Sequence, residues 1–397
     1  MRFGRWAGLL LVAAPFLAGC GNFWQAPSGT GGGGGSCTTN CTTATSGYFY
    51  VLNNPLSGTP TVVSEYIASG SLTQLTGSPL TLPGTPSSMS IAPNDNFLCV
   101  STNTGVIAYP ISNGALGTAG VTASADVYVS AIQVDQSSSW LIEAVPGTGG
   151  VTIEAVSINS TTGVATGAEY PFSITIGNSA ATIGANQMVI SPDNNNIFVA
   201  LGSAGTIVVP FNHNAASGKS PLGTTYTKIP VVHSSGSALS VAVDPTNRLF
   251  YIGETLANSA SNSGGLRIFN YSTFNELTTS PVATNALSPN FILPLSSGDY
   301  VYVANGTGAG NAGTVAAFAV TSSGTTYSLT AGPTIAAGSQ PLGLAEDSTG
   351  TFLFEVGSAG SPYFDSFTFD TTTAGQLDTQ VTSSTASGSI AIVAAPQ

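Results

Sequence analysis

Charged residues are scarce in this chain. It has six Lys and Arg and 18 Asp and Glu among 397 residues, or 6% of the sequence, where about 25% is usual. So few cations cannot neutralise a run of phosphates, which excludes a nucleic-acid partner and disfavours phosphorylated substrates. The scarcity does not indicate disorder, because 42% of the residues are hydrophobic and disordered chains are poor in them. A coiled coil is excluded as well, since Ala, Glu, Lys and Leu do not recur at a helical period.

The N-terminus lacks an apolar run of the roughly 20 residues that span a membrane, but it contains a shorter one. Two arginines precede the apolar stretch 6–18, and Leu17-Ala18-Gly19 stands directly before Cys20. These features form a secretory signal over residues 1–19, and its end resembles the lipobox of bacterial lipoproteins. The pattern predicts a lipid on Cys20; the alternative is an ordinary signal with an incidental cysteine. Because Gly21 follows instead of an acidic residue, the outer membrane of a bacterial cell envelope is the favoured location.

Residues 20–45 are rich in Gly, Ser and Thr, a composition that predicts a flexible tether between the anchor and the rest of the chain. Within the tether, Cys37 and Cys41 are a candidate disulfide in an oxidising compartment, with free thiols as the alternative. A metal site would need further ligands, and none lies nearby in the sequence. Cys99 stands in an apolar run and is predicted to be a small buried hydrophobe.

A repeated pattern of strand, tight polar turn and strand organises the remaining residues, 46–397. The clearest copies are 90–100, 189–199 and 241–252, and weaker ones are 132–143, 292–303 and 344–355. A third strand and a fourth strand follow most copies. The second strands carry equivalent positions at Val51, Val100, Glu143, Val199, Ile252, Val303 and Glu355. Four strands per roughly 50 residues is the period of a β-propeller blade.

The first copy is incomplete, which predicts how the ring closes. Residues 48–51 form a second strand that no first strand precedes, and the segment 389–393 at the other end of the chain resembles the missing strand. Pairing the two would complete the first blade and cover two sheet edges. The sequence therefore predicts an all-β fold: a single seven-bladed β-propeller closed by its C-terminal strand. An open array of β-sandwiches is the structural alternative.

The repeat resembles lactonase-type seven-bladed propellers, the 6-phosphogluconolactonase-like and YVTN-repeat proteins. The resemblance rests on the Ser-Pro-Asp-Asn turn within 189–199 and on aromatic and Thr-x-Gly-x-Leu pieces at 157–164 and 367–377. It implies hydrolysis of sugar lactones by a set that includes a His-x-His before one such turn. Here the matching stretch 184–192 contains no His, Ala200-Leu201-Gly202 lacks an expected acid, and Gln340 replaces an expected Arg. The scaffold is retained, and this catalytic set is not.

Another constellation is a candidate catalytic site. His233 lies in a connection between blades, Glu254 follows the second strand of the same blade, and Arg267 begins its third strand. All three are expected at one end of the ring, with Glu143 and Glu355 from other blades. A His, an Arg and carboxylates could perform acid–base chemistry if they converged. The alternative is that all of them are solvated rim residues.

Two functions follow. The first is a lipid-anchored, non-enzymatic propeller that binds a glycan, an envelope polymer or another protein. The second is an extracytoplasmic lactonase or hydrolase that acts on a sugar-type lactone with a non-standard set around His233. The sequence predicts a monomer with no cofactor and no metal. The Asp193-Asn194-Asn195-Asn196 run has oxygen ligands that suit calcium, but these residues also favour tight turns, which is the preferred interpretation.

Overall fold

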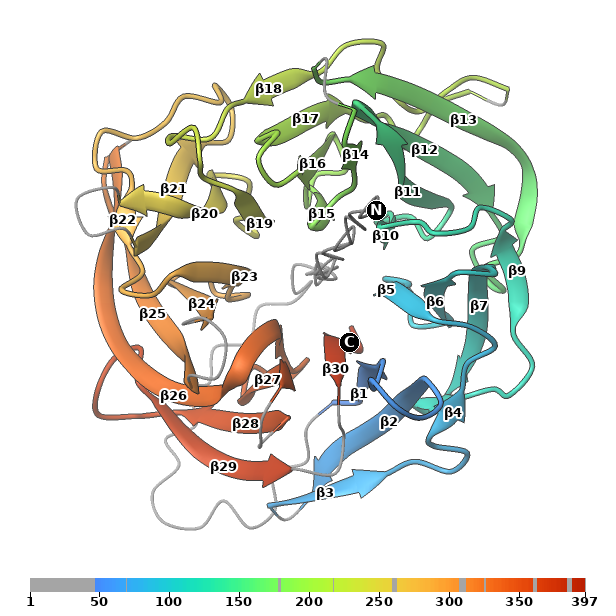
Figure 1. The fold of residues 1–397 in the computed structure, drawn as a ribbon. Coiled ribbons are helices and arrows are strands. Elements are labelled where there is room, and N and C mark those ends of the chain that lie inside the picture. Colours follow the sequence, from blue (N-terminus) through green and yellow to red (C-terminus); the bar gives the residue numbers. More distant parts are fainter. Residues whose placement is uncertain are drawn as a thin grey trace, which may run out of the picture.

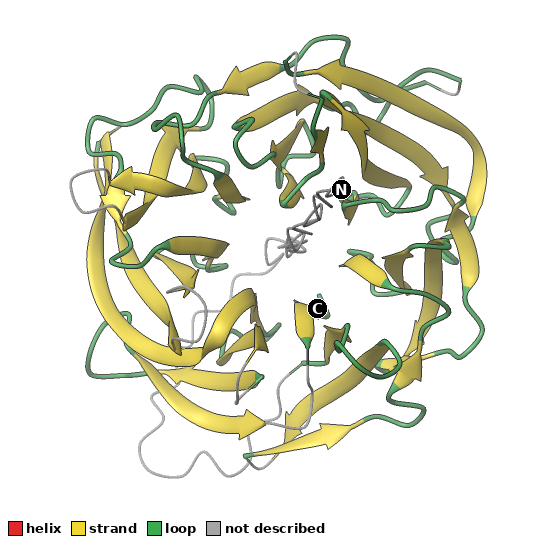
Figure 2. Cartoon of the chain, in the orientation of Figure 1, coloured by secondary structure: helices red, strands yellow, loops and turns green. Residues whose placement is uncertain are grey.

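The computed structural model describes residues 47–396, except 69, 178–179, 217, 259–262, 307–311, 325, 360–362 and 384–387. Its regular elements in these ranges are all β-strands, arranged as seven blades around a central axis (Figures 1 and 2). This confirms the predicted seven-bladed propeller. The predicted signal, the lipidated Cys20, the tether and the Cys37–Cys41 pair lie outside the described residues.

Each blade is an antiparallel sheet whose first strand lies nearest the axis. Blade 1 contains β30 (Ser389–Ala394), β1 (Phe49–Asn53), β2 (Thr61–Ala68), β3 (Ser71–Gln74) and β4 (Leu80–Thr81). Blade 2 contains β5 (Pro86–Ile91), β6 (Phe97–Thr102), β7 (Gly105–Ser112), β8 (Ala115–Leu116) and β9 (Val121–Ser124). Blade 3 contains β10 (Ala131–Val134), β11 (Trp140–Thr148), β12 (Gly150–Ile158), β13 (Ala165–Thr175) and β14 (Thr182–Ile183).

Blades 4 and 5 repeat the plan without additions. Blade 4 contains β15 (Gln187–Ile190), β16 (Asn196–Ala200), β17 (Thr206–Pro210) and β18 (Thr227–Ile229). Blade 5 contains β19 (Ala238–Val243), β20 (Leu249–Asn258), β21 (Ser263–Asn270) and β22 (Val282–Ala283).

Blades 6 and 7 share one long strand. The sheet contains β23 (Ser288–Pro294), β24 (Tyr300–Gly306), β25 (Ala312–Ser323), β26 (Thr326–Glu346), β27 (Phe352–Ala359), β28 (Phe364–Phe369) and β29 (Leu377–Ser383). The first part of β26 pairs with β25 as the outer strand of blade 6, and its last part pairs with β27 as the inner strand of blade 7. Figure 1 shows β26 sweeping along the rim between the two blades.

The C-terminal strand closes the ring as predicted. β30 pairs antiparallel with β1, with Val51 opposite Ile392 and Tyr50 opposite Val393, and the two strands lie side by side in Figure 1. The side chain of Ser389 also donates a hydrogen bond to Asn53 Oδ1 at 2.8 Å. The pairing covers the edges that β1 and β30 would otherwise expose. The first and last segments of the described ring therefore stabilise each other.

The antiparallel order gives the ring two distinct ends. Connections from second to third strands, and from fourth strands to the next blade, lie at one end, which we call the loop end. Connections from first to second strands and from third to fourth strands lie at the other, which we call the turn end. β1 runs from the turn end to the loop end, so the described chain enters the ring at the turn end.

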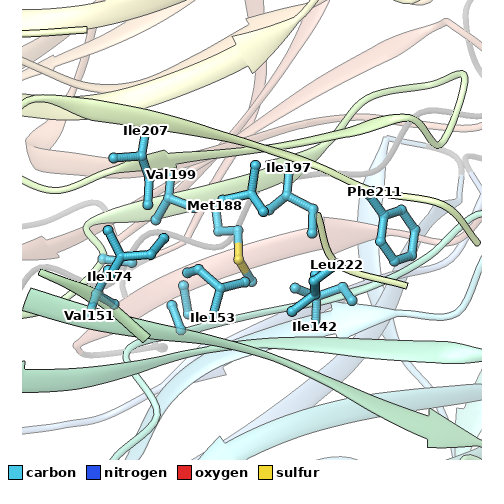
Figure 3. Packing of buried hydrophobic residues seen from close by; sticks show 14 of the residues in the cluster. Ile142, Val151, Ile153, Ile174, Met188, Ile197, Val199, Ile207, Phe211 and Leu222 are labelled. Carbon is cyan, nitrogen blue, oxygen red and sulfur yellow. The ribbon is translucent and has the colours of Figure 1, made fainter. Parts of the chain in front are cut away.

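The core lies between neighbouring blades because strand residues alternate between two faces. Figure 3 shows the cluster between blades 3 and 4, where Ile142 and Ile153 from one blade meet Met188, Ile197 and Val199 from the other. Corresponding clusters fill the other interfaces. Such packing needs apolar strands and few charges, which accounts for the composition.

The repeated polar turns share one backbone geometry. In each turn between first and second strands, the fourth residue donates its N–H to the carbonyl of the first residue. That fourth residue has a left-handed φ, which Asn, Asp and Gly adopt most readily. The six positions are Asp95, Ser138, Asn194, Asn247, Gly298 and Gly350. Within one of these turns, Asp193 accepts hydrogen bonds from Ser191 and Tyr271, so its carboxylate serves the turn and the next blade.

Uncharged polar side chains join the inner strands around the axis. In each case, a Ser, Asn or Gln from one inner strand, or from the residues beside it, bonds a backbone group at the inner edge of the next blade. The pairs are Ser88–Ile132, Ser90–Val134, Ser130–Ala185, Gln187–Val241, Ser240–Pro289 and Asn290–Pro341, at 2.7–3.0 Å. These hydrogen bonds stabilise the ring, because a buried backbone N–H or C=O without a partner costs free energy.

Glycine turns at the turn end receive aromatic rings from the preceding blade. Gly114, between β7 and β8, has φ +76°, and a Cβ there would overlap the ring of Tyr48. The hydroxyl of Tyr50 donates to the carbonyl of Gly114 at 3.0 Å. Gly375 repeats the arrangement in blade 7, since a Cβ would lie 2.7 Å from the ring of Tyr300. These contacts fix the spacing between adjacent blades.

Replacing Gly114 with Ala is therefore expected to destabilise the domain by about 2–4 kcal/mol, because a left-handed φ and a steric overlap act together. Gly70→Ala is the matched control, since Gly70 has φ +72° with nothing within 4 Å of a Cβ. Urea denaturation of both variants separates the two effects. Equal losses in the two variants would show that the Tyr48 contact contributes nothing.

Candidate functional site

Two of the three predicted catalytic residues are in direct contact. Glu254 lies in β20 and Arg267 in β21, and Arg267 Nη1 is 2.7 Å from Glu254 Oε1. A second carboxylate, Glu276, accepts two further hydrogen bonds from the same guanidinium, at 2.6 and 3.1 Å. Glu254 is fully buried and Arg267 almost so. The single cation of Arg267 thus contacts two carboxylates, the buried Glu254 and the more exposed Glu276. Glu254 and Arg267 are therefore not solvated rim groups.

This ion network also holds the connection that carries His233. Arg267 Nη1 donates to the Pro230 carbonyl at 2.7 Å, and the Val232 N–H donates to Glu254 Oε2 at 3.0 Å. The His233 side chain is exposed, and its Nδ1 accepts a hydrogen bond from the Ser235 N–H at 3.2 Å. The structure therefore places His233 on a braced loop, with its ring bonded to its own loop. The catalytic assignment of the three residues stays a prediction.

We expect Arg267→Ala to destabilise the domain by about 3–5 kcal/mol, because the buried Glu254 loses its counter-charge. The double variant Arg267→Met with Glu254→Gln removes both buried charges and is expected to recover most of that loss. Urea denaturation measures the two effects, and limited proteolysis between Pro230 and Ser235 reports the loop. A double variant as unstable as the single one would contradict a buried ion pair.

The other two predicted carboxylates lie at equivalent positions in blades 3 and 7. Glu143 and Glu355 occupy in β11 and β27 the register that Ile252 occupies in β20, as the repeat predicted. Opposite them on the third strands stand Glu154 and Asp365, where blade 5 has Arg267. Blades 3 and 7 thus hold acid–acid pairs at the place where blade 5 holds its cation.

These pairs do not converge with His233. Glu143 packs toward blade 2, where Ser124 Oγ donates to its Oε2 at 3.1 Å, and its other oxygen is buried without a hydrogen bond in the described structure. Glu355 lies fully buried beside Asp365, on the face of blade 7 that packs toward blade 6. The carboxylates therefore belong to three separate blade interfaces.

Burial raises the pKa of both glutamates well above the ordinary value. For Glu143, the neighbouring Asp126 adds to the rise in pKa and the Ser124 hydrogen bond opposes it. For Glu355, Asp365 adds to the rise in pKa and the Gly338 amide opposes it. Burial also raises the pKa of Glu154 to about 7, with help from a hydrogen bond to Asp126. A raised pKa favours the protonated carboxyl in each pair, which reduces the repulsion between its two acids.

Sequence reasoning missed Asp126, Glu154, Glu276 and Asp365. Glu154 and Asp365 stand on third strands, and Glu276 stands in the connection after one. The number of residues between second and third strands varies from blade to blade, so the repeat does not predict these positions. The alternation in Val151-Thr152-Ile153-Glu154 was a usable signal, since it places Glu154 on the opposite face from Ile153.

Charge and exposed apolar surface are segregated between the two ends of the ring. Within the described residues, the connections at the loop end contain no Lys or Arg, and their Asp, Glu and His residues are Asp126 and His233 alone. The turn end carries Asp95, Asp135, Asp193, Lys219, Asp244, Arg248, Glu276, Asp299, Asp347 and Asp370, together with His213. Conversely, five of the exposed large apolar side chains lie in loop-end connections: Leu56, Val127, Tyr128, Val232 and Leu287.

Other features of the described chain offer little chemistry. No group of three His, Cys, Asp or Glu side chains is placed there to hold a metal ion, and no helix long and apolar enough to cross a membrane occurs there. Cys99 is buried as predicted, and burial raises the pKa of its thiol. A cavity of about 300 Å³ between blades 6 and 7 is lined in part by Tyr302 and Gly375, whose hydroxyl and carbonyl bond each other at 3.1 Å.

The fold is that of the lactonase-type seven-bladed propellers, as the comparison with solved structures shows. A Bacteroides fragilis protein provisionally named a 6-phosphogluconolactonase matches with TM-score 0.66 and 14% identity, over 90% of this chain and 99% of that one. The periplasmic gluconolactonase of Pseudomonas aeruginosa matches with TM-score 0.63 and 15% identity, over 88% and 100%.

The same fold extends to proteins with other names. The propeller domain of a Swd1 protein from Myceliophteria thermophila matches with TM-score 0.55 and 10% identity, over 80% of this chain and 91% of that one. No protein-family model and no curated protein matches the sequence. The comparisons therefore show the architecture and not the function, because one fold can support many functions.

Proposed function

We propose that this protein is a lipid-anchored propeller of the cell envelope that acts as a binding module, with its loop end as the binding surface. The segregation of exposed apolar side chains and charge between the two ends carries this proposal. Monomeric proteins scatter such side chains singly, whereas here Leu56, Tyr128, Val232 and Leu287 share one nearly uncharged end.

The residues at the family's catalytic positions support binding over catalysis. Asn186 and Gln187 lie in the stretch 184–192, where the resemblance implies a His-x-His, and both bond the backbone of β19, at 2.9 and 3.0 Å. Gln340, at the expected Arg, accepts from Ser358 at 3.3 Å. These side chains contribute to the joints between strands and blades, so they do not form a free catalytic set.

Site-specific photocrosslinking in cells tests the binding surface. A photoreactive amino acid is placed at Leu56, Tyr128 or Leu287, and at Val121 or Val164 as matched controls, which are exposed but outside the loop end. We expect adducts with a protein, glycan or lipid from the loop-end positions and not from the controls. Equal yields at both sets of positions would contradict the proposal.

The anchor is tested separately. Cells that express the full chain are labelled with a radioactive fatty acid, and the label is expected on the protein and in the outer-membrane fraction. Cys20→Ser is expected to lose the label and release the protein from the membrane. A labelled Cys20→Ser chain would contradict lipidation at this residue.

The second candidate is an extracytoplasmic hydrolase of sugar-type lactones, favoured by the fold shared with the Pseudomonas aeruginosa gluconolactonase. It is tested by turnover of sugar lactones, with His233→Ala as the variant and Val232→Ala as the control from the same exposed loop. Turnover that disappears only in His233→Ala would replace the binding proposal by this one. No turnover above the uncatalysed rate is the result that we expect.

A further inference from the structure

We propose that the loop end docks on the lipid bilayer of the membrane to which the chain is anchored, so that the propeller lies on the membrane and is not held away from it. This inference rests on the proposed function, because it names the partner of the same surface.

The form of the apolar surface favours a bilayer over a protein. Leu56 lies in the connection of blade 1, Tyr128 between blades 2 and 3, Val232 between blades 4 and 5, and Leu287 between blades 5 and 6. Leu56 has a relative exposure of 109% and Tyr128 of 68%. Separate apolar tips around a ring match a flat, fluid layer that admits each tip individually. A tyrosine suits the boundary between headgroups and acyl chains, since its ring is apolar and its hydroxyl is polar.

The distribution of charged residues allows the loop end, and not the turn end, to dock on a bilayer. Charged side chains enter the apolar layer at a large cost, and the described connections of the loop end have no Lys or Arg. Asp126 is half-buried there and bonds Glu154, which leaves His233 as the exposed ionisable group that would stay at the headgroups. The acidic residues collected at the turn end exclude that end from an apolar layer.

The tether is long enough for the loop end to reach the membrane. The described chain enters the ring at the turn end, so docking through the loop end requires the predicted tether, 20–45, to span the height of a blade. Its Gly-rich composition predicts a root-mean-square length of about 30 Å. A strand that crosses the height of blade 5, β20 with 10 residues, spans about 33 Å. A tether whose length matches the distance it spans gives the loop end its highest effective concentration at the membrane once the lipid anchor is inserted. Weakly binding apolar side chains are then enough to dock the loop end.

The test uses the mature lipidated protein in phosphatidylcholine vesicles that carry a radiolabelled lipid. A photoreactive amino acid at Leu56, Tyr128 or Leu287 is expected to crosslink to lipid at least five times more than one at Val121 or Val164. The triple variant Leu56→Ser, Val232→Ser and Leu287→Ser is expected to reduce the lipid adduct at position 128 to the control value. Raising the salt concentration should leave the yields unchanged, because the contact is apolar.

The outcomes separate the two proposals. Equal lipid adducts at loop-end and control positions would overturn bilayer docking. If loop-end positions in cells then crosslink to a protein or a glycan, the binding function stands and only its partner changes. If they crosslink to nothing, both proposals fail.

Discussion

A chain that ends at Gly388 is expected to lose its closed ring and to aggregate at concentrations where the full chain is soluble. Without β30, β1 loses its inner partner strand, and the inner strands of blades 7 and 2 lose the strand that packs against both. Unpaired edges promote association with other chains. Burial of Ile392 and Val393 contributes about 1.5–3 kcal/mol for each side chain, and a domain is stable by only about 5–15 kcal/mol.

Thermal denaturation and light scattering measure this effect, and single substitutions give it a finer test. Ile392 is fully buried against blade 7, whereas the side chain of Ile390 is half-buried. Ile392→Ala is expected to lose about 2–5 kcal/mol, and Ile390→Ala clearly less. A truncated chain that stays monomeric with an unchanged unfolding transition would refute the clasp.

The stability of the domain is expected to fall as the pH rises from about 4.5 to 8, which is the second large effect. Folding raises the pKa of Glu143 and Glu355, of Glu154 to about 7 and of Asp365 to about 6. Below their ordinary pKa values, these groups are protonated in both the folded and the unfolded chain. As the pH rises, the unfolded chain ionises first. A group that binds its proton tenfold more tightly in the folded chain removes about 1.4 kcal/mol of stability once both forms are ionised.

Glu355→Gln tests the cause, because the amide has nearly the same shape and cannot ionise. We expect the variant to lose less stability between pH 4.5 and 8 than the unaltered protein, in urea titrations at several pH values. Asp299→Asn is the control, since Asp299 is exposed at the turn end and should leave the slope unchanged. Glu276 acts in the opposite direction, because hydrogen bonds from Arg267 and Ser280 lower its pKa, and its contribution is lost as the pH falls below its ordinary pKa. A steeper decline in Glu355→Gln would contradict the buried acid pair.

The fold was largely predictable because a propeller is a local pattern repeated. Each blade contributes to the core through the alternation of apolar residues along its own strands. Each turn forms because it contains a residue that adopts a left-handed φ, such as Asn194 or Asn247. The clasp was predictable because 389–393 has the same pattern as the first strands of the other blades. Even the equivalence of Glu143, Ile252 and Glu355 followed from the repeat.

The candidate site was less predictable. The sequence placed Glu254 and Arg267 at one end of the ring, and the structure shows them in direct contact. The second carboxylate, Glu276, stands in a turn whose distance from Arg267 depends on the loop path. The sequence also placed Glu143 and Glu355 at a shared mouth, whereas the structure buries each one between two blades. Alternation along the strands puts these equivalent positions on the face that packs against the preceding blade, so they do not meet around the axis.

The sequence by itself determined the repeat, the closure by the C-terminal strand and the scarcity of charge, because these properties are written in local patterns and composition. Only the tertiary structure decided which side chains of the connections are exposed and which are buried. The folded ring gathers the charges at the turn end and the exposed Leu, Val and Tyr side chains at the loop end. The physical reason is that antiparallel strands return alternate connections to the same end, which brings together residues that are up to 231 positions apart, from Leu56 to Leu287.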